Sequence, residues 1–179
     1  MKHQRIVFVT VFVSMFAVGI AGVCLFAFRS SDPAPDPQLS PEQVVQIQLD
    51  ALKHNDPDTD AGIAITFRFA SPANRQHMGP LERFALVLKS PRYRPMLYHK
   101  SAEFSPVWIQ GGRAGQIVRL ISADGQAVFY AFVLSKQRRR PYADCWMTDG
   151  VFRIPKQRLP PSYPDAPAYR GVPHDDMPI

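Results

Sequence analysis

Histidine, cysteine and acidic side chains are the groups in this chain with which acid–base or nucleophilic chemistry would begin. His99 lies at the start of the first long stretch of strand-forming residues, and it is the best candidate for a general base because the ordinary pKa of imidazole is near neutrality. The alternative is a surface histidine at a strand end. Cys145 has no base near it in the sequence, so we expect a buried structural cysteine instead of a nucleophile.

Sequence motifs for metals, cofactors and nucleotides are missing. The chain contains no HExxH, CxxC, GxGxxG or P-loop string. The run His174-Asp175-Asp176 is not expected to bind a metal, because ordering an isolated flexible segment costs too much conformational entropy. We therefore predict no cofactor, no metal site and no catalytic residue beyond the candidate His99.

Two groups of side chains point to binding. Aromatic residues could line a pocket for an apolar ligand, or they could be ordinary core and rim packing. The densest basic run could contact anionic lipid head groups or an acidic partner, or it could simply keep a hairpin loop and sheet edge soluble. The aromatic group is Tyr93, Tyr98, Tyr130 and Trp146, and the basic group is Lys136, Arg138, Arg139 and Arg140.

One strand carries apolar residues on both faces. The stretch from Val128 to Leu134 is apolar throughout, whereas a strand in a sheet with one wet face alternates. One row can pack against helices. The other row is Phe129, Ala131 and Val133, and leaving it exposed is unfavourable because burying a Phe is worth about 1.5–3 kcal/mol. We expect cover from a second copy, another protein or the 163–169 segment, and we favour a protein partner.

Helical signals occupy the first part of the domain. Ser40-Pro41-Glu42-Gln43 is a capping box with proline at the first helical position, followed by a one-sided apolar stripe. A second helix is expected over 60–69. A third begins at Gly79-Pro80 and ends at Ser90-Pro91, and we expect only a turn at Ser71-Pro72.

Strand signals follow the helices. The candidate strands are roughly 97–109, 114–122, 126–136 and 145–154, with a hairpin turn at Asp124-Gly125. Helices followed by a run of strands predict an α+β fold, with three helices packed on a curved antiparallel sheet of about four to five strands.

The N-terminal segment predicts a membrane anchor. Ile6 to Phe28 carries no charge, and as a helix it would span about 34 Å, enough for a bilayer core. A cleaved signal peptide and a lipoprotein are the alternatives. Lys2 and Arg5 favour a cytoplasmic N-terminus with the domain periplasmic or lumenal. No nucleic acid partner is expected for an exported domain, despite the net charge of +6.

These signals divide the chain into four parts. Residues 1–29 are the cytoplasmic flank and transmembrane anchor, 30–40 a proline-rich linker, 41–155 the α+β domain, and 156–179 a proline-rich tail. If the anchor spans the bilayer, Cys24 and Cys145 cannot meet, and no disulfide is expected. Stability must then come from the core of the domain.

Five short strings occur in order along the domain. They are Phe69-Ala70-Ser71-Pro72-Ala73-Asn74, Gly79-Pro80-Leu81-Glu82-Arg83-Phe84, Pro91-Arg92-Tyr93-Arg94-Pro95, Leu134-Ser135-Lys136-Gln137 and Cys145-Trp146-Met147-Thr148-Asp149. Together they resemble the family known as domain of unknown function 4864, over roughly residues 43–154. The resemblance implies the cone-shaped fold of nuclear transport factor 2-like proteins, with a cavity between sheet and helices, and it implies no activity.

Three functions are compatible with these observations. The first is a membrane-anchored binding or assembly module without enzymatic activity, which binds a partner or a small apolar ligand. The second is a small hydrolase or isomerase that uses His99 with a carboxylate in the cone cavity. The third is a structural subunit of a membrane complex.

Overall fold

The structure of the protein is a computed structural model that describes residues 32–159. The elements in chain order are α1 (Pro41–Lys53), α2 (Ala61–Arg68), α3 (Pro72–Met78), α4 (Leu81–Leu88), the 3₁₀ helix η1 (Arg94–Met96), β1 (Ser101–Phe104), β2 (Trp108–Gln110), β3 (Arg113–Ile121), β4 (Ala127–Lys136), β5 (Trp146–Ile154) and the 3₁₀ helix η2 (Lys156–Arg158).

Local sequence determines where α1 begins. Ser40 is the N-cap, its hydroxyl accepts a hydrogen bond from the Gln43 amide, and the Gln43 side chain accepts one from the Ser40 amide. The predicted capping box is thus confirmed, with Pro41 at the first helical position. The apolar stripe of α1, which includes Val45, Leu49 and Leu52, is fully buried.

The helical layer contains one helix more than we predicted. The expected helices at 60–69 and after Gly79-Pro80 are present as α2 and α4. The turn expected at Ser71-Pro72 instead opens α3, in which the Ser71 hydroxyl accepts a hydrogen bond from the Asn74 amide. This helix has no buried residue, so it lacks the apolar stripe by which a helix is recognised in a sequence.

The five strands form one antiparallel sheet in the order β1-β3-β4-β5, and β2 also pairs with β3. The stretch predicted as one strand over 97–109 is two short strands, β1 and β2, which pair with opposite ends of β3. Pro106 lies between them and has no amide hydrogen for a ladder bond. The Asp124-Gly125 turn joins β3 to β4 as predicted, with Gly125 at φ 86°.

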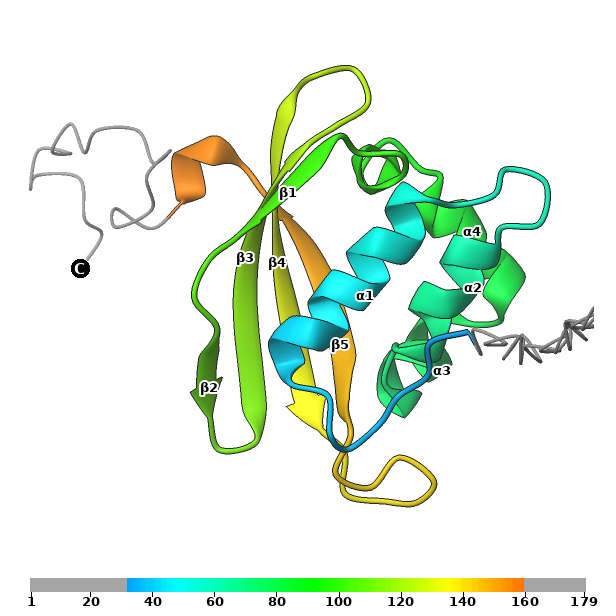
Figure 1. The fold of residues 1–179 in the computed structure, drawn as a ribbon, viewed down its shortest axis with the longest axis vertical. Coiled ribbons are helices and arrows are strands. Elements are labelled where there is room, and N and C mark those ends of the chain that lie inside the picture. Colours follow the sequence, from blue (N-terminus) through cyan, green and yellow to red (C-terminus); the bar gives the residue numbers. More distant parts are fainter. Residues whose placement is uncertain (1–31, 160–179) are drawn as a thin grey trace, which may run out of the picture. The chain divides into compact units, whose positions relative to one another are not determined.

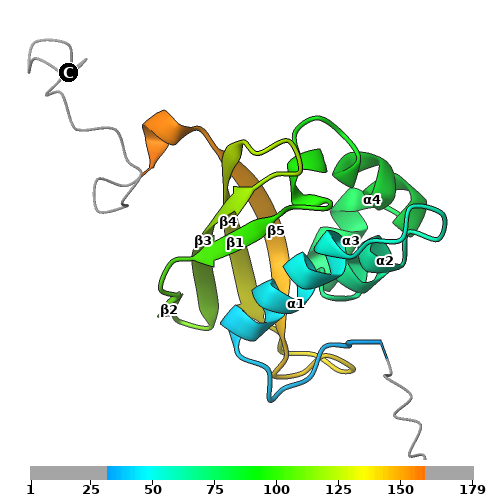
Figure 2. The ribbon, with the colours of Figure 1, turned by 45° about the horizontal axis from the view of Figure 1, so that its top comes forward.

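The four helices lie together on one side of the sheet, as Figure 1 shows, and the same arrangement is visible after the 45° turn of Figure 2. The main core lies between these two layers, where Val44, Ile63 and Phe69 from the helices meet Val118 and Tyr130 from the strands. The predicted α+β class is therefore correct, with four α-helices and five strands among residues 32–159.

Thr148 on β5 joins the helical layer to the sheet. Its amide donates to the Phe69 carbonyl, and its own carbonyl accepts from the Ser71 amide, both at 2.8 Å. The Gln48 side chain of α1 donates to the Thr148 hydroxyl at 2.8 Å. A bulge between Val133 and Leu134 of the neighbouring strand lies opposite this point, so the ladder is interrupted where the helices attach.

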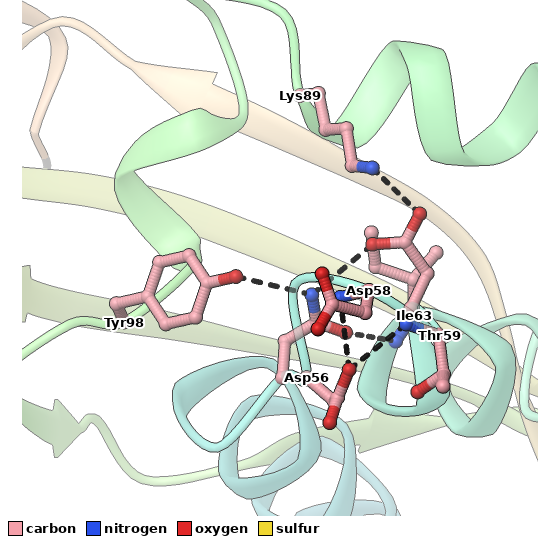
Figure 3. Close-up of polar contacts among 8 residues, drawn as sticks. Asp56, Asp58, Thr59, Ile63, Lys89 and Tyr98 are labelled. Atoms are coloured by element: carbon pink, nitrogen blue, oxygen red, sulfur yellow. Dashed lines mark hydrogen bonds and ion pairs between the residues drawn. The ribbon is translucent and has the colours of Figure 1, made fainter.

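A second polar cluster fixes the loop between α1 and α2, as Figure 3 shows. The Asn55 side chain accepts from the Ile63 amide at 3.1 Å and donates to Asp60 at 3.3 Å. Asp60 forms an ion pair with Lys89 at the end of α4, at 2.6 Å. Because Asn55 also donates to the Tyr98 hydroxyl at 3.4 Å, the cluster connects α1, α2, α4 and the segment before β1.

Within residues 32–159 there is no helix long and apolar enough to cross a membrane. The predicted anchor at 6–28 and the segment from 160 onward lie outside the described residues. Residues 32–39, predicted as part of a linker, contact the domain. Asp32 forms an ion pair with Arg68 at 2.8 Å, and Leu39 packs against the core.

Gly62 allows α1 and α2 to approach closely. A Cβ at this position would overlap the Ala51 carbonyl oxygen of α1 and would lie 3.0 Å from the Asn55 Cα. These are backbone atoms that cannot move aside as a flexible side chain can. The two helices would have to separate to admit even one methyl group.

We predict that Gly62→Ala lowers the free energy of unfolding by about 3 kcal/mol or more, because overpacking against backbone costs about 1–3 kcal/mol even where the structure can relax. Chemical denaturation of the 32–159 fragment measures the change. The matched control is Gly115→Ala, where the added Cβ would make only ordinary contacts, 3.5 Å from the Trp108 ring and 3.8 Å from the Phe132 carbonyl oxygen. Equal stability of the two variants would contradict the proposed close approach.

Candidate functional site

A cavity of about 270 Å³ lies between the helices and the sheet. Its wall is mostly apolar, as is usual for sites that bind small organic molecules. The apolar part includes Phe84, Val87 and Leu88 from α4 and Phe132 from β4. The polar part comes from α1, α2, α3 and β5, and its side chains are Gln48, Thr66, Asn74, His77, Thr148 and Asp149.

Most of the polar groups inside the cavity already have protein partners. Gln48 Nε2 donates to the Val44 carbonyl and to Thr148 Oγ1, at 3.1 and 2.8 Å. Thr66 Oγ1 donates to the Gly62 carbonyl at 2.9 Å, and Asn74 Nδ2 donates to the Thr148 carbonyl at 3.0 Å. These hydrogen bonds hold the polar side chains in place, but they do not use every acceptor atom of the polar wall.

The Gln48 side-chain oxygen is the exception. Gln48 is 2% exposed and lines the cavity. Among the hydrogen bonds of residues 32–159, the two that this amide makes both use its nitrogen, and none uses its oxygen. Because Gln48 lines the cavity, this oxygen is available to a ligand that brings a hydrogen-bond donor.

An imidazole and a carboxylate lie at the mouth of the cavity. His77 at the end of α3 and Asp149 on β5 both line the cavity and the shallow depression next to it, and both are exposed. The Asp149 carboxylate accepts from the Ser135 hydroxyl at 2.9 Å. The sequence analysis missed His77, because α3 was not recognised and nothing local indicates that its end docks beside β5.

His99 is in a different place from the one we expected. It lies in the segment before β1, is 4% exposed, and is absent from the wall of the cavity. Its Nδ1 is 2.9 Å from the Met96 carbonyl oxygen, which requires a proton on that nitrogen. The alternative of a surface histidine is wrong because His99 is buried, and this burial lowers the pKa of its imidazole.

The four aromatic candidates do not converge on one site. Tyr93 lines the cavity, and Tyr130 stacks behind it with ring centroids 6.4 Å apart. Tyr130 is fully buried, its hydroxyl donates to the Arg92 carbonyl, and burial raises its pKa. Tyr98 is exposed at the other end of the domain, and Trp146 packs against the edge of the core.

The row predicted to need cover is partly buried within the chain. Phe129 is 3% exposed, whereas Ala131 and Val133 are half-buried. By strand register the same face carries two exposed aromatic rings, those of Trp108 and Phe152, which lie against Gly115 and Gly150. What covers this face in the cell stays a prediction, and the 163–169 segment lies outside the described residues.

The residues of the basic run do not line the cavity either. Lys136, Arg138, Arg139 and Arg140 belong to the end of β4 and the loop that leads to β5. Cys145 closes this loop and is buried as expected; burial raises the pKa of its thiol. The candidates of the sequence analysis therefore occupy separate regions, and only Tyr93 contributes to the cavity.

Residues 36–159 match a family described as Domain of unknown function (DUF4864). The chain belongs to this family. The match extends slightly beyond the region in which we recognised the resemblance, and it includes every residue of the cavity wall. No curated protein and no solved structure matches the chain. Membership in the DUF4864 family assigns no activity.

The buried imidazole of His99 predicts a pH-dependent stability. Its pKa is below 6.5 in the folded chain, mainly because burial disfavours the charged form. Below pH 6.5 the unfolded chain therefore binds a proton that the folded chain does not. The free energy of unfolding should fall as the pH drops from 6.5 toward the folded pKa, by at most about 1.4 kcal/mol per pH unit.

Denaturation curves at a series of pH values test this, with His99→Gln as the variant that should flatten the slope. His54→Gln is the matched control, because His54 is an exposed histidine on the surface of the same region. An unchanged slope in His99→Gln would contradict the assignment.

Proposed function

We propose that this chain is a membrane-tethered binding module whose cavity holds a small, mainly apolar ligand. The observation that carries the proposal is the 270 Å³ cavity with its apolar wall on α4 and β4. A helix–sheet interface packed for stability alone is filled by side chains, because empty space forfeits dispersion contacts. An open cavity of this size therefore favours a ligand.

The polar wall indicates the chemistry of that ligand. The unused Gln48 oxygen suits a hydroxyl or amine donor inside the cavity. His77 and Asp149 at the mouth can contact a second polar group or water. The ligand class that fits is a small apolar molecule with one hydrogen-bond donor.

The fold and the tether belong to the same proposal. Four helices on one face of an antiparallel sheet, with a cavity between, are consistent with the nuclear transport factor 2-like fold implied by the family resemblance. The uncharged stretch Ile6 to Phe28 supports a single-pass anchor with the domain on the far side of the membrane.

One observation favours an enzyme as the second candidate. His77 and Asp149 provide an imidazole and a carboxylate at the mouth of the cavity, which are the groups that a small hydrolase or isomerase needs. His99 does not fill this role, because it is buried away from the cavity against the Met96 carbonyl. A ligand that returns chemically changed after incubation would favour this candidate over the binding module.

We predict that the 32–159 fragment binds the neutral fluorescent probe N-phenylnaphthylamine in a saturable manner. The Val87→Trp variant, at a half-buried position in the cavity wall, should weaken this binding at least about tenfold, or about 1.4 kcal/mol, because the indole fills the space. Fluorescence titration gives both dissociation constants.

The matched control is Leu86→Trp, one residue earlier on α4, where the side chain is 71% exposed. It adds the same indole outside the cavity and should leave probe binding unchanged. Equal weakening by both variants, or no saturable binding by the original fragment, would contradict a ligand site in the cavity.

A further inference from the structure

A second, strongly basic hollow lies outside the cavity. It is formed by the start of α3, the β2–β3 turn and the β4–β5 loop, and it encloses about 930 Å³. Five arginines and one lysine line it, and no acidic residue does. We call it the basic hollow; its cationic side chains are Arg75, Arg113, Lys136, Arg138, Arg139 and Arg140.

These positive charges are not neutralised within the domain. Among residues 32–159, none of the five arginines of the basic hollow forms an ion pair. Lys136 alone reaches a carboxylate there, that of Asp144 at 3.6 Å. The Arg75 guanidinium lies over the Tyr142 ring, 4.9 Å from its centroid, and both residues line the hollow. Six like charges, five of them without a counter-charge among residues 32–159, favour an external anion.

The described chain begins at the same end of the domain. Asp32 is paired with Arg68, shortly before α3, and Asp36 is close enough to Cys145 to help raise the pKa of that thiol. Figures 1 and 2 both show the segment from Asp32 to α1 (blue) running beside the β4–β5 loop (gold). The point at which the chain enters the domain is therefore next to the basic hollow.

That entry point limits how far the domain can stand from a membrane. Arg29, Ser30 and Ser31 alone separate Asp32 from the predicted anchor, a reach of at most about 14 Å from Phe28. Head groups extend several ångströms beyond the hydrocarbon, and their field decays over about 8–10 Å. The end of the domain that carries the basic hollow would thus lie within the field of the head groups.

We propose that the basic hollow contacts the phosphate groups of anionic phospholipids in the membrane that holds the chain. This rests on the membrane tether in the proposed function. Arginine suits the role because its planar guanidinium can donate two parallel hydrogen bonds to one phosphate. The contact orients the domain. The depression lined by Arg113, His77 and Asp149 lies between the hollow and the mouth of the cavity, so this orientation places the mouth close to the bilayer surface.

The test uses the full chain in lipid nanodiscs of phosphatidylcholine alone or with phosphatidylglycerol added. Trypsin cleavage after Arg138 and Arg139 is compared with cleavage after Arg92. Arg92 is exposed and lies at the other end of the sheet, where nearby residues and the β3–β4 turn line another hollow. Phosphatidylglycerol should slow loop cleavage at least about fivefold relative to Arg92, and high salt should reverse the effect.

Matched variants assign the effect to the basic hollow. Arg113→Gln should reduce the protection about fivefold, the ratio that corresponds to about 1 kcal/mol per cationic side chain at an anionic surface. Arg94→Gln removes the same charge at the opposite end and should leave the protection unchanged. Loop cleavage that is independent of phosphatidylglycerol would overturn the lipid contact.

Two further outcomes separate the alternatives. Equal protection by inorganic phosphate added to phosphatidylcholine discs would show that the basic hollow takes a free anion, and this would overturn the lipid proposal. A chain that does not remain with the discs during gel filtration would overturn the tether itself, and with it this proposal. A chain that remains with the discs but lacks lipid-dependent protection leaves the tether intact and overturns only the lipid contact.

Discussion

The attachment of the helical layer to β5 at Thr148 is the constraint on which the rest of the structure depends. The backbone of Thr148 bonds to Phe69 and Ser71, and its hydroxyl accepts from Gln48, so one residue holds α1 and the α2–α3 connection against the sheet. Thr148 is 2% exposed, and a buried polar group of this kind has to be paired. The bulge at Val133 and Leu134 makes the pairing of β4 with β5 irregular next to Thr148.

This attachment also forms part of the cavity wall. Gln48, Asn74 and Thr148, which hold the helices to β5, line the cavity together with the apolar residues of α4 and β4. At Gly62 the absence of a Cβ allows α2 to pack closely against α1. The cluster around Asn55 and Asp60 then ties α4 to the same helices.

Sequence patterns predicted those features whose cause is local. The capping box of α1, the Asp124-Gly125 hairpin and the apolar periodicity of α4 depend on residues a few positions apart, and each is found where it was expected. Helix α3 was missed because its position depends on bonds to Thr148, far away in the chain. His77 was missed for the same reason. His99 was placed at the start of a strand that begins only at Ser101, and its burial does not follow from the pattern of neighbouring residues.

The cavity and the basic hollow both include residues from α3, and the depression lined by His77, Arg113 and Asp149 shares residues with each of them. A domain held by its basic end on anionic lipid would present an apolar cavity close to the bilayer. That arrangement suits a ligand that partitions into membranes, because such a molecule reaches the cavity without crossing much water. The basic hollow would then hold the cavity close to the membrane in which such a ligand is dissolved.

The most direct test of the central claim is a crystal structure of the 32–159 fragment under xenon pressure. Xenon occupies dry apolar cavities and avoids polar, hydrated ones. The account predicts a xenon atom between Phe84, Leu88 and Phe132, in the apolar part of the cavity wall. Rings of Phe84 and Phe132 in direct contact there, or ordered waters filling the space without xenon, would contradict an apolar ligand site.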